Sequence, residues 1–175
     1  MHQLVESDPD VELIWRAFEL RPEPVPMIDP NSDYLRRGWT DSVAPLAERL
    51  GVTMKFPTVK PRTRLAHEAA HWARAQGRFE DYHDGIFRAF FERGEDIGNI
   101  DILVALAVEL GLDGDSLRQA LFSHEFAESV LADERDAAGI GLSSVPAFIA
   151  NRKAALTGVQ PVENLIKLIE SVRAG

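Results

Sequence analysis

The hydrophobic and polar positions divide the chain into three stretches. Residues Val11–Leu20 are rich in β-branched and aromatic side chains on both faces, which is typical of a strand buried on both sides. Across residues 29–140 the apolar positions recur at helical spacing, and they predict an almost wholly helical region. Two short apolar runs, Val145–Ala150 and Ala154–Gly158, then predict a β-hairpin, and Pro161 begins a final amphipathic helix.

Six helices are predicted between residues 29 and 140. Several of them end at a glycine, Asn99 and Asp115 are predicted N-caps, and Pro45 starts or kinks the first helix. The segment Met54–Pro61 fits no helix. The predicted helices are Val43–Leu50, Arg64–Gln76, Phe79–Arg93, Ile100–Leu110, Ser116–Phe122 and Glu125–Ala138. The order of strand, helical insertion, two strands and helix predicts an α/β domain interrupted by helices.

The composition and charge of the chain restrict the classes of protein to which it can belong. The 175 residues are 45% hydrophobic and 27% charged, as in soluble globular domains. A net charge of -9 argues against nucleic acid and anionic membrane surfaces as partners. No apolar run approaches the roughly 18 residues of a membrane helix, and the N-terminus lacks the basic start and apolar stretch of a secretory signal. These features predict a cytoplasmic protein.

The chain contains no cysteine. A disulfide, a thiolate nucleophile and a cysteine-ligated metal site are therefore excluded for these residues. A reducing compartment fits this composition, since disulfides are rare there.

Several segments carry a resemblance to a known family. They are Trp15–Pro22, Ala66–Glu68, Ile86–Phe91, Ala138–Phe148 and Gly158–Leu165. In this order and spacing they resemble the DsbA-like thioredoxin-fold proteins, in particular the FrnE-like branch, which is similar to 2-hydroxychromene-2-carboxylate isomerases. The resemblance spans essentially the whole chain. It implies a thioredoxin-like α/β core of residues 1–28 and 139–175, with a large all-helical insertion at residues 29–138.

The N-terminus departs from the family pattern. Family members begin with a strand and then a Cys-x-x-Cys pair, or a catalytic serine in the isomerases, that opens a helix. Here Met1–Ser7 resembles the end of that helix, so we expect the N-terminal βα unit to be missing or truncated. In the family that first strand lies between the second strand and the strand at Val145–Ile149. We therefore expect the chain to rearrange or to form a homo-oligomer that completes the sheet.

The resemblance implies a thiol–disulfide oxidoreductase, but a chain without cysteine is predicted to be redox-inactive as it stands. Two alternatives stay open. One is a relative of glutathione-dependent isomerases and transferases, with glutathione as ligand. The other is a non-catalytic module whose exposed sheet pairs with a protein partner. No other cofactor is predicted.

Val145 and Pro146 are the predicted substrate-binding residues. In the family the residue before a cis-proline presents its backbone N–H and C=O groups to an extended peptide, a thiol substrate or glutathione. The resemblance implies this role here. The alternative is an ordinary proline at the start of an edge strand.

A zincin-like pattern lies in the helical region. His67 and His71 are one helical turn apart, so both can face one metal, and Glu68 between them can activate a water molecule. No third ligand is singled out, although Glu92 and His83 are candidates. Two solvated or partly packed histidines are the alternative. A zinc hydrolase is therefore a remote alternative, and no metal site is predicted.

Three further groups of residues have a functional and a structural interpretation. Arg16 and Glu19 either border a groove or form a polar pair at a sheet end. An aromatic stripe, formed by Tyr82, Phe87, Phe90 and Phe91, either lines a substrate groove or belongs to the core. A basic patch, formed by Lys55, Lys60, Arg62 and Arg64, either binds an anion or is a solvated loop.

Overall fold

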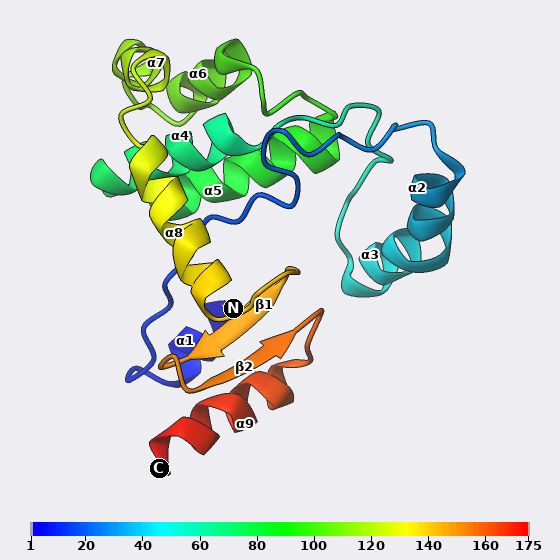
Figure 1. The fold of residues 1–175 in the computed structure, drawn as a ribbon, viewed down its shortest axis with the longest axis vertical. Helices are drawn as coiled ribbons and strands as arrows, with labels where there is room; N and C mark the ends of the chain where they lie inside the picture. Colours follow the sequence, from blue (N-terminus) through cyan, green and yellow to red (C-terminus); the bar gives the residue numbers. More distant parts are fainter. Residues whose placement is uncertain (1, 175) are drawn as a thin grey trace. The chain divides into compact units, whose positions relative to one another are not determined.

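The computed structural model describes residues 2–174. The chain forms two compact units (Figure 1). One contains the residues up to Leu20 and those from Asp133 onward, and the other is Arg21–Ala132. The domain boundaries expected at residues 28 and 139 remain a prediction. Among the described residues, no helix is both long and apolar enough to cross a lipid bilayer.

The unit Arg21–Ala132 is helical, as predicted. Two of its helical stretches contain π-helical turns, in which the α-helical hydrogen-bond pattern is widened. The elements are α2 (Asp33–Gly38), the π-helix η1 (Trp39–Val43), α3 (Ala44–Leu50), α4 (Arg64–Ala75), α5 (Phe79–Phe87), the π-helix η2 (Arg88–Arg93), α6 (Ile100–Glu109) and α7 (Gly114–Phe122). Helix α8 (Ala127–Gly139) begins in this unit and ends in the other.

The helix caps are partly as predicted. Asn99 caps α6, since its side chain accepts a hydrogen bond from the Asp101 N–H. The prediction of Asp115 as the cap of α7 is wrong. The cap is Asp113, whose carboxylate accepts the Ser116 N–H at 3.0 Å. The reason is that Gly114 already adopts the helical conformation, which moves the helix start two residues towards the N-terminus.

The core of this unit lies where α4, α5, α6 and α7 pack together. Tyr82, Leu103 and Leu117 are fully buried in it. The Tyr82 hydroxyl donates a 2.7 Å hydrogen bond to the Leu103 carbonyl, so the buried polar atom is satisfied. Burial raises the pKa of Tyr82. Gly85 permits the close contact of α5 with α6, because an added Cβ would lie 2.7 Å from a Leu106 methyl group.

The other unit contains the only sheet among residues 2–174. Strands β1 (Ala147–Ala150) and β2 (Ala154–Thr157) pair antiparallel, with Ala147 opposite Thr157. Asn151 and Arg152 both take left-handed φ values in the connecting turn, and the Lys153 N–H bonds to the Ala150 carbonyl. Helix α9 (Val162–Arg173), capped by Pro161, contacts both strands. The predicted hairpin and final helix are confirmed.

The predicted buried strand at Val11–Leu20 is wrong. The segment is extended, but the structure describes no strand there. A strand requires a neighbouring ladder, and the two described strands pair with each other. Side chains alternate between more buried and exposed positions along the segment, so only one face is covered: Ala17 and Glu19 are buried, whereas Ile14 is 55% exposed. The short helix α1 (His2–Ser7) precedes this segment.

Candidate functional site at Val145 and Pro146

Val145 and Pro146 lie at the beginning of β1. The peptide bond between them is cis. The Pro146 carbonyl accepts the Gly158 N–H at 2.8 Å, which fixes the entry to β1 against the residue after β2. The Val145 side chain is 41% exposed. Backbone groups at the start of a strand can form hydrogen bonds with an extended partner. The predicted binding role of both residues remains a prediction.

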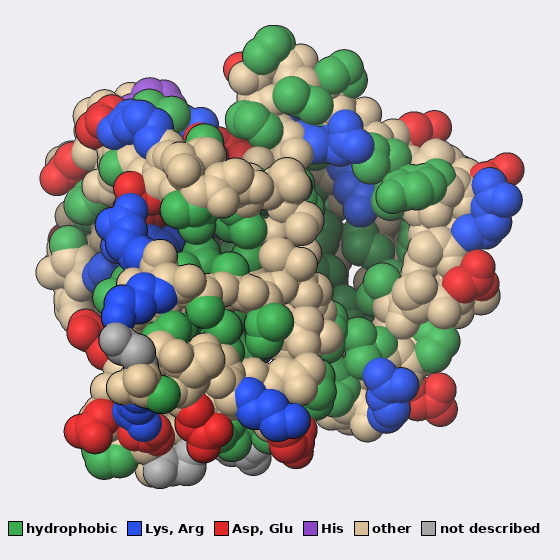
Figure 2. Space-filling model, turned by 60° about the horizontal axis from the view of Figure 1, so that its bottom comes forward, with side chains coloured by type: hydrophobic (Ala, Val, Ile, Leu, Met, Phe, Trp, Pro, Cys, Tyr) green, Lys and Arg blue, Asp and Glu red, His purple; other side chains and the backbone are tan. Residues whose placement is uncertain are grey.

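Large hydrophobic side chains are exposed in the same unit. Figure 2 shows hydrophobic side chains exposed between acidic and basic ones on the face in view. Over its whole surface, the unit that holds the hairpin exposes the large hydrophobic residues Ile14, Leu20, Ile140, Val145, Ile149, Val159, Val162 and Ile166. Val145 and Ile149 are among these exposed residues, so the start of β1 carries apolar surface. No residue from 145 to 150 has a nucleophilic side chain.

Arg16 and Glu19 do not form the pair that the sequence suggested. The Arg16 guanidinium donates to the carboxylate of Asp133 at 2.7 Å, and the Ala17 N–H donates to the other oxygen of the same carboxylate at 2.9 Å. Asp133 is 3% exposed. Sequence reasoning missed this residue, although it lies between Val130 and Ala137 on the buried face of α8, where a charge signals a specific partner. Asp133 therefore anchors the extended segment Val11–Leu20.

The zincin-like pattern is not assembled into a metal centre. Within residues 2–174, no group of three or more histidine and acidic side chains is placed to hold a metal ion. Glu68 is 1% exposed, and one carboxylate oxygen lies 3.2 Å from Nδ1 of His124. No pattern in the sequence indicates His124, which follows α7, as the partner of Glu68. His67 and His71 are half-buried on the same helix.

The aromatic stripe separates into two environments. Tyr82 is in the core. Phe79, His83, Phe87 and Phe91 form a continuous row, with ring centroids 5.0, 4.9 and 6.1 Å apart in turn. Burial lowers the pKa of His83, which favours the neutral ring in this row. The spacing of four residues places these rings on one helix face, as in a packed helix rather than in a cofactor site.

One residue of the basic patch, Arg62, forms hydrogen bonds within the unit Arg21–Ala132. Arg62 donates hydrogen bonds to the carbonyls of Arg21 and Val25, at 2.7 and 2.8 Å. Burial lowers the pKa of Lys60. Arg62 therefore holds the proline-rich loop that follows Leu20, which supports the structural interpretation of this residue.

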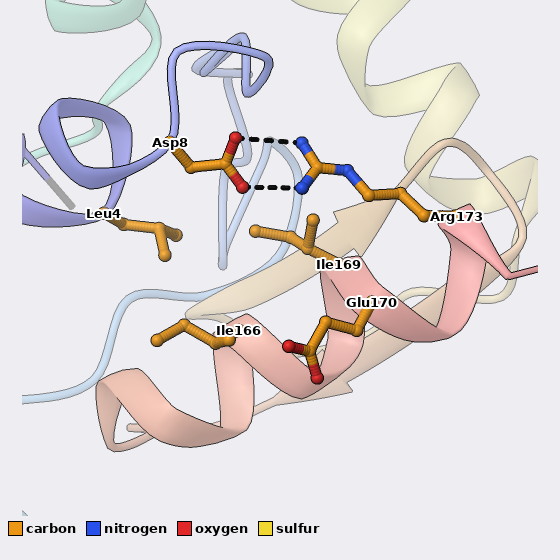
Figure 3. A pocket seen from close by; sticks show the side chains of 6 residues that line it. All are labelled: Leu4, Asp8, Ile166, Ile169, Glu170 and Arg173. Atoms are coloured by element: carbon orange, nitrogen blue, oxygen red, sulfur yellow. Dashed lines mark hydrogen bonds and ion pairs between the residues drawn. The ribbon is translucent and has the colours of Figure 1, made fainter.

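A small pocket lies between α1 and α9 (Figure 3). Its volume is about 220 Å³. Leu4, Ile166 and Ile169 form its apolar side, and Arg173 closes its rim with two hydrogen bonds to Asp8, at 2.6 and 3.0 Å. The Arg173 guanidinium lowers the pKa of the Asp8 carboxyl below its ordinary value of 3.8. This pair joins α9 to the end of α1.

We expect the contact between α1 and α9 to weaken in acid. Because the pKa of Asp8 is depressed in the folded chain, its stabilising contribution is complete above pH 3.8 and is lost as the pH falls through the depressed pKa. The amide signals of α1 should shift in that acidic range when followed by NMR. Asp8→Asn should abolish this transition, whereas Asp10→Asn should retain it, and an identical transition in both variants would contradict the assignment.

The hairpin, the helix packed on it and the inserted helical unit define the class of thioredoxin-like α/β folds. A family model, the DSBA-like thioredoxin domain, matches residues 1–170. The chain belongs to this DSBA-like family, as the resemblance predicted, and it has the thioredoxin-like fold with a helical insertion.

Two known proteins extend this comparison. The chain is 41% identical over 146 residues to the uncharacterized protein YwbO of Bacillus subtilis (strain 168). The aligned residues make up 80% of this chain and 72% of YwbO. Its fold is similar to the crystal structure of a probable DsbA oxidoreductase from Streptomyces coelicolor. That match has a TM-score of 0.82 and 25% identity, and it covers 99% of this chain and 81% of the other.

Proposed function

We propose that this chain is a polypeptide-binding protein of the DsbA family that uses the backbone at Val145 and Pro146. The observation that carries this proposal is the exposed Val145 immediately before Pro146, at the entry to β1. Family membership supports a ligand that is an extended peptide or a thiol compound. Such ligands bind by hydrogen bonds from backbone to backbone, and neighbouring apolar side chains add affinity.

The activity of the family is thiol–disulfide exchange, which needs an attacking thiolate. The 175 residues contain none. The proposal is therefore binding without electron exchange by this chain alone. We place the chain in the FrnE-like branch, on the segments that resemble it. We also place it in the cytoplasm, where a chain without disulfides is ordinary.

The test is a titration of the isotope-labelled chain, followed by NMR. The probe is the capped peptide Lys-Thr-Val-Thr-Val-Thr-Lys, which is extended, soluble and basic against the net charge of -9. We expect its binding to shift the Val145 amide signal. Val145→Asp should weaken binding about tenfold, because a charge replaces apolar contact surface at the site. Val159→Asp is the matched control, since Val159 is an exposed valine of the same unit.

Two further measurements test whether the chain is redox-inactive and whether its ligand is a peptide or a small thiol. The chain should show no insulin-reduction activity, and turnover above background would contradict the redox part of the proposal. Glutathione is titrated in parallel. If glutathione shifts Val145 and the peptide does not, the ligand is a small thiol and the polypeptide part of the proposal is wrong.

A further inference from the structure

Elements α2, η1 and α3 follow one another without a break and form one helix, Asp33–Leu50, here called the α2–α3 helix (Figure 1). Its middle is a π-helical turn, in which the Ala44 N–H bonds to the Trp39 carbonyl five residues back. Such a turn inserts one residue into the helix. The residues after the turn are therefore rotated by about 100° relative to an uninterrupted α-helix, because one residue accounts for that angle.

This rotation places the apolar residues of both halves on one face. When the inserted residue is counted, a projection at about 100° per residue puts all of them except Pro45 within one half of the helix circumference. The charged residues lie in the other half. The apolar residues of this face are Tyr34, Leu35, Trp39, Val43, Ala44, Leu46, Ala47 and Leu50. The π-helical turn therefore joins two short amphipathic pieces into one continuous apolar face.

One edge of this face is covered and the other is open. On the covered edge, the Trp39 ring contacts the Phe56 ring edge to face, with centroids 5.6 Å apart. On the open edge, Tyr34 is 71% exposed and Leu50 is 61% exposed. Within the described unit Arg21–Ala132, no other helix packs closely against the α2–α3 helix. A row of exposed apolar side chains along a whole helix is typical of a docking surface.

The charges of the α2–α3 helix favour a second copy of this chain as the occupant. The helix carries three acidic and three basic residues, so its net charge is zero, whereas the whole chain carries -9. The excess of acidic residues therefore lies entirely outside this helix, and two copies that meet here bring neutral surfaces together. The six charged residues are Asp33, Arg36, Arg37, Asp41, Glu48 and Arg49.

We propose that this chain forms a dimer through the α2–α3 helix, with the open apolar faces of two copies packed antiparallel about a two-fold axis at Ser42. The symmetry places Tyr34 beside the partner's Leu50, and it repeats the same contact on the other side of the axis. It also places the partner's Leu46 over Gly38, where an added Cβ would meet no atom within 4 Å. One helix face is a small interface, so the dimer should be weak and depend on concentration.

Sedimentation equilibrium of the chain, from micromolar to millimolar concentration, tests the dimer. Leu50→Glu should weaken dimerisation by about tenfold or more, because it places a charge against an apolar face. Val108→Glu on α6 is the matched control, since Val108 is also 61% exposed. It should dimerise as the original chain does. A chain that stays monomeric at millimolar concentration, or equal dimerisation in the two variants, would overturn the proposal.

A charge pair tests the antiparallel arrangement. Tyr34→Lys and Leu50→Glu should each weaken the dimer when introduced alone. The variant that carries both should dimerise more tightly than the two single effects combined predict, because the new charges lie opposite each other across the interface. Tyr34→Lys combined with Val108→Glu should show no such coupling. Additive effects of Tyr34→Lys and Leu50→Glu would mean that these two residues do not meet, and the two-fold arrangement would be wrong.

Discussion

Replacing Asp133 with alanine should lower the free energy of unfolding by about 3 kcal/mol. The carboxylate is 3% exposed and accepts two hydrogen bonds, from the Arg16 guanidinium and from the Ala17 N–H. Its removal leaves the buried Ala17 N–H without this acceptor, and an unsatisfied buried donor is costly. The midpoint of urea denaturation, followed by circular dichroism, measures the change.

Arg16→Ala is the control for this prediction. The Arg16 side chain is 57% exposed, so solvent screens its ion pair with Asp133. Its loss should cost no more than about 1 kcal/mol. If Arg16→Ala destabilises the chain as much as Asp133→Ala does, the exposed ion pair and not the buried backbone contact holds the segment Val11–Leu20, and our interpretation of Asp133 is wrong.

The second large effect concerns the helical core. Leu117→Ala should lower the free energy of unfolding by about 3 kcal/mol, because it removes buried methyl groups and leaves a cavity. Leu117 is 0% exposed and packs in the cluster formed by α4, α5, α6 and α7. Thermal and urea denaturation both measure the loss. The effect should be independent of pH, since the change removes no titratable group.

Phe122→Ala is the matched variant on the same helix. Phe122 is larger than Leu117 but 67% exposed, so its truncation removes little buried surface. We expect a change within about 0.5 kcal/mol. A loss from Phe122→Ala that equals the loss from Leu117→Ala would show that the outer face of α7 is covered in solution.

Much of the local structure could be predicted from the sequence. Helices α3 to α8 were identified because glycines and polar caps interrupt a strong helical periodicity, whereas α2 was not among the predicted helices. Asn99 was recognised as a cap by its residue type and position. The cap of α7 was misplaced by two residues, because Asp113 and Asp115 are equally good caps by residue type and the backbone of Gly114 decides between them.

The candidate site was predictable only in part. Val145 and Pro146 were selected by family resemblance, and their exposure and their place before β1 agree with an accessible site. The partners of Arg16 and Glu68 were not predicted. Asp133 and His124 lie more than 50 positions away along the chain, and no periodicity connects side chains over that separation.

By itself the sequence determined helices α3 to α9, the hairpin, the absence of a thiol and the resemblance to DsbA-like proteins, because each depends on residue type and short spacing. The tertiary structure alone decided three other features. It left Val11–Leu20 extended without a ladder, gave Asp133 its anchoring role, and placed the Gln160 side chain on the Thr157 carbonyl of β2. The physical reason is that hydrogen bonds between distant backbone groups depend on which segments meet in space.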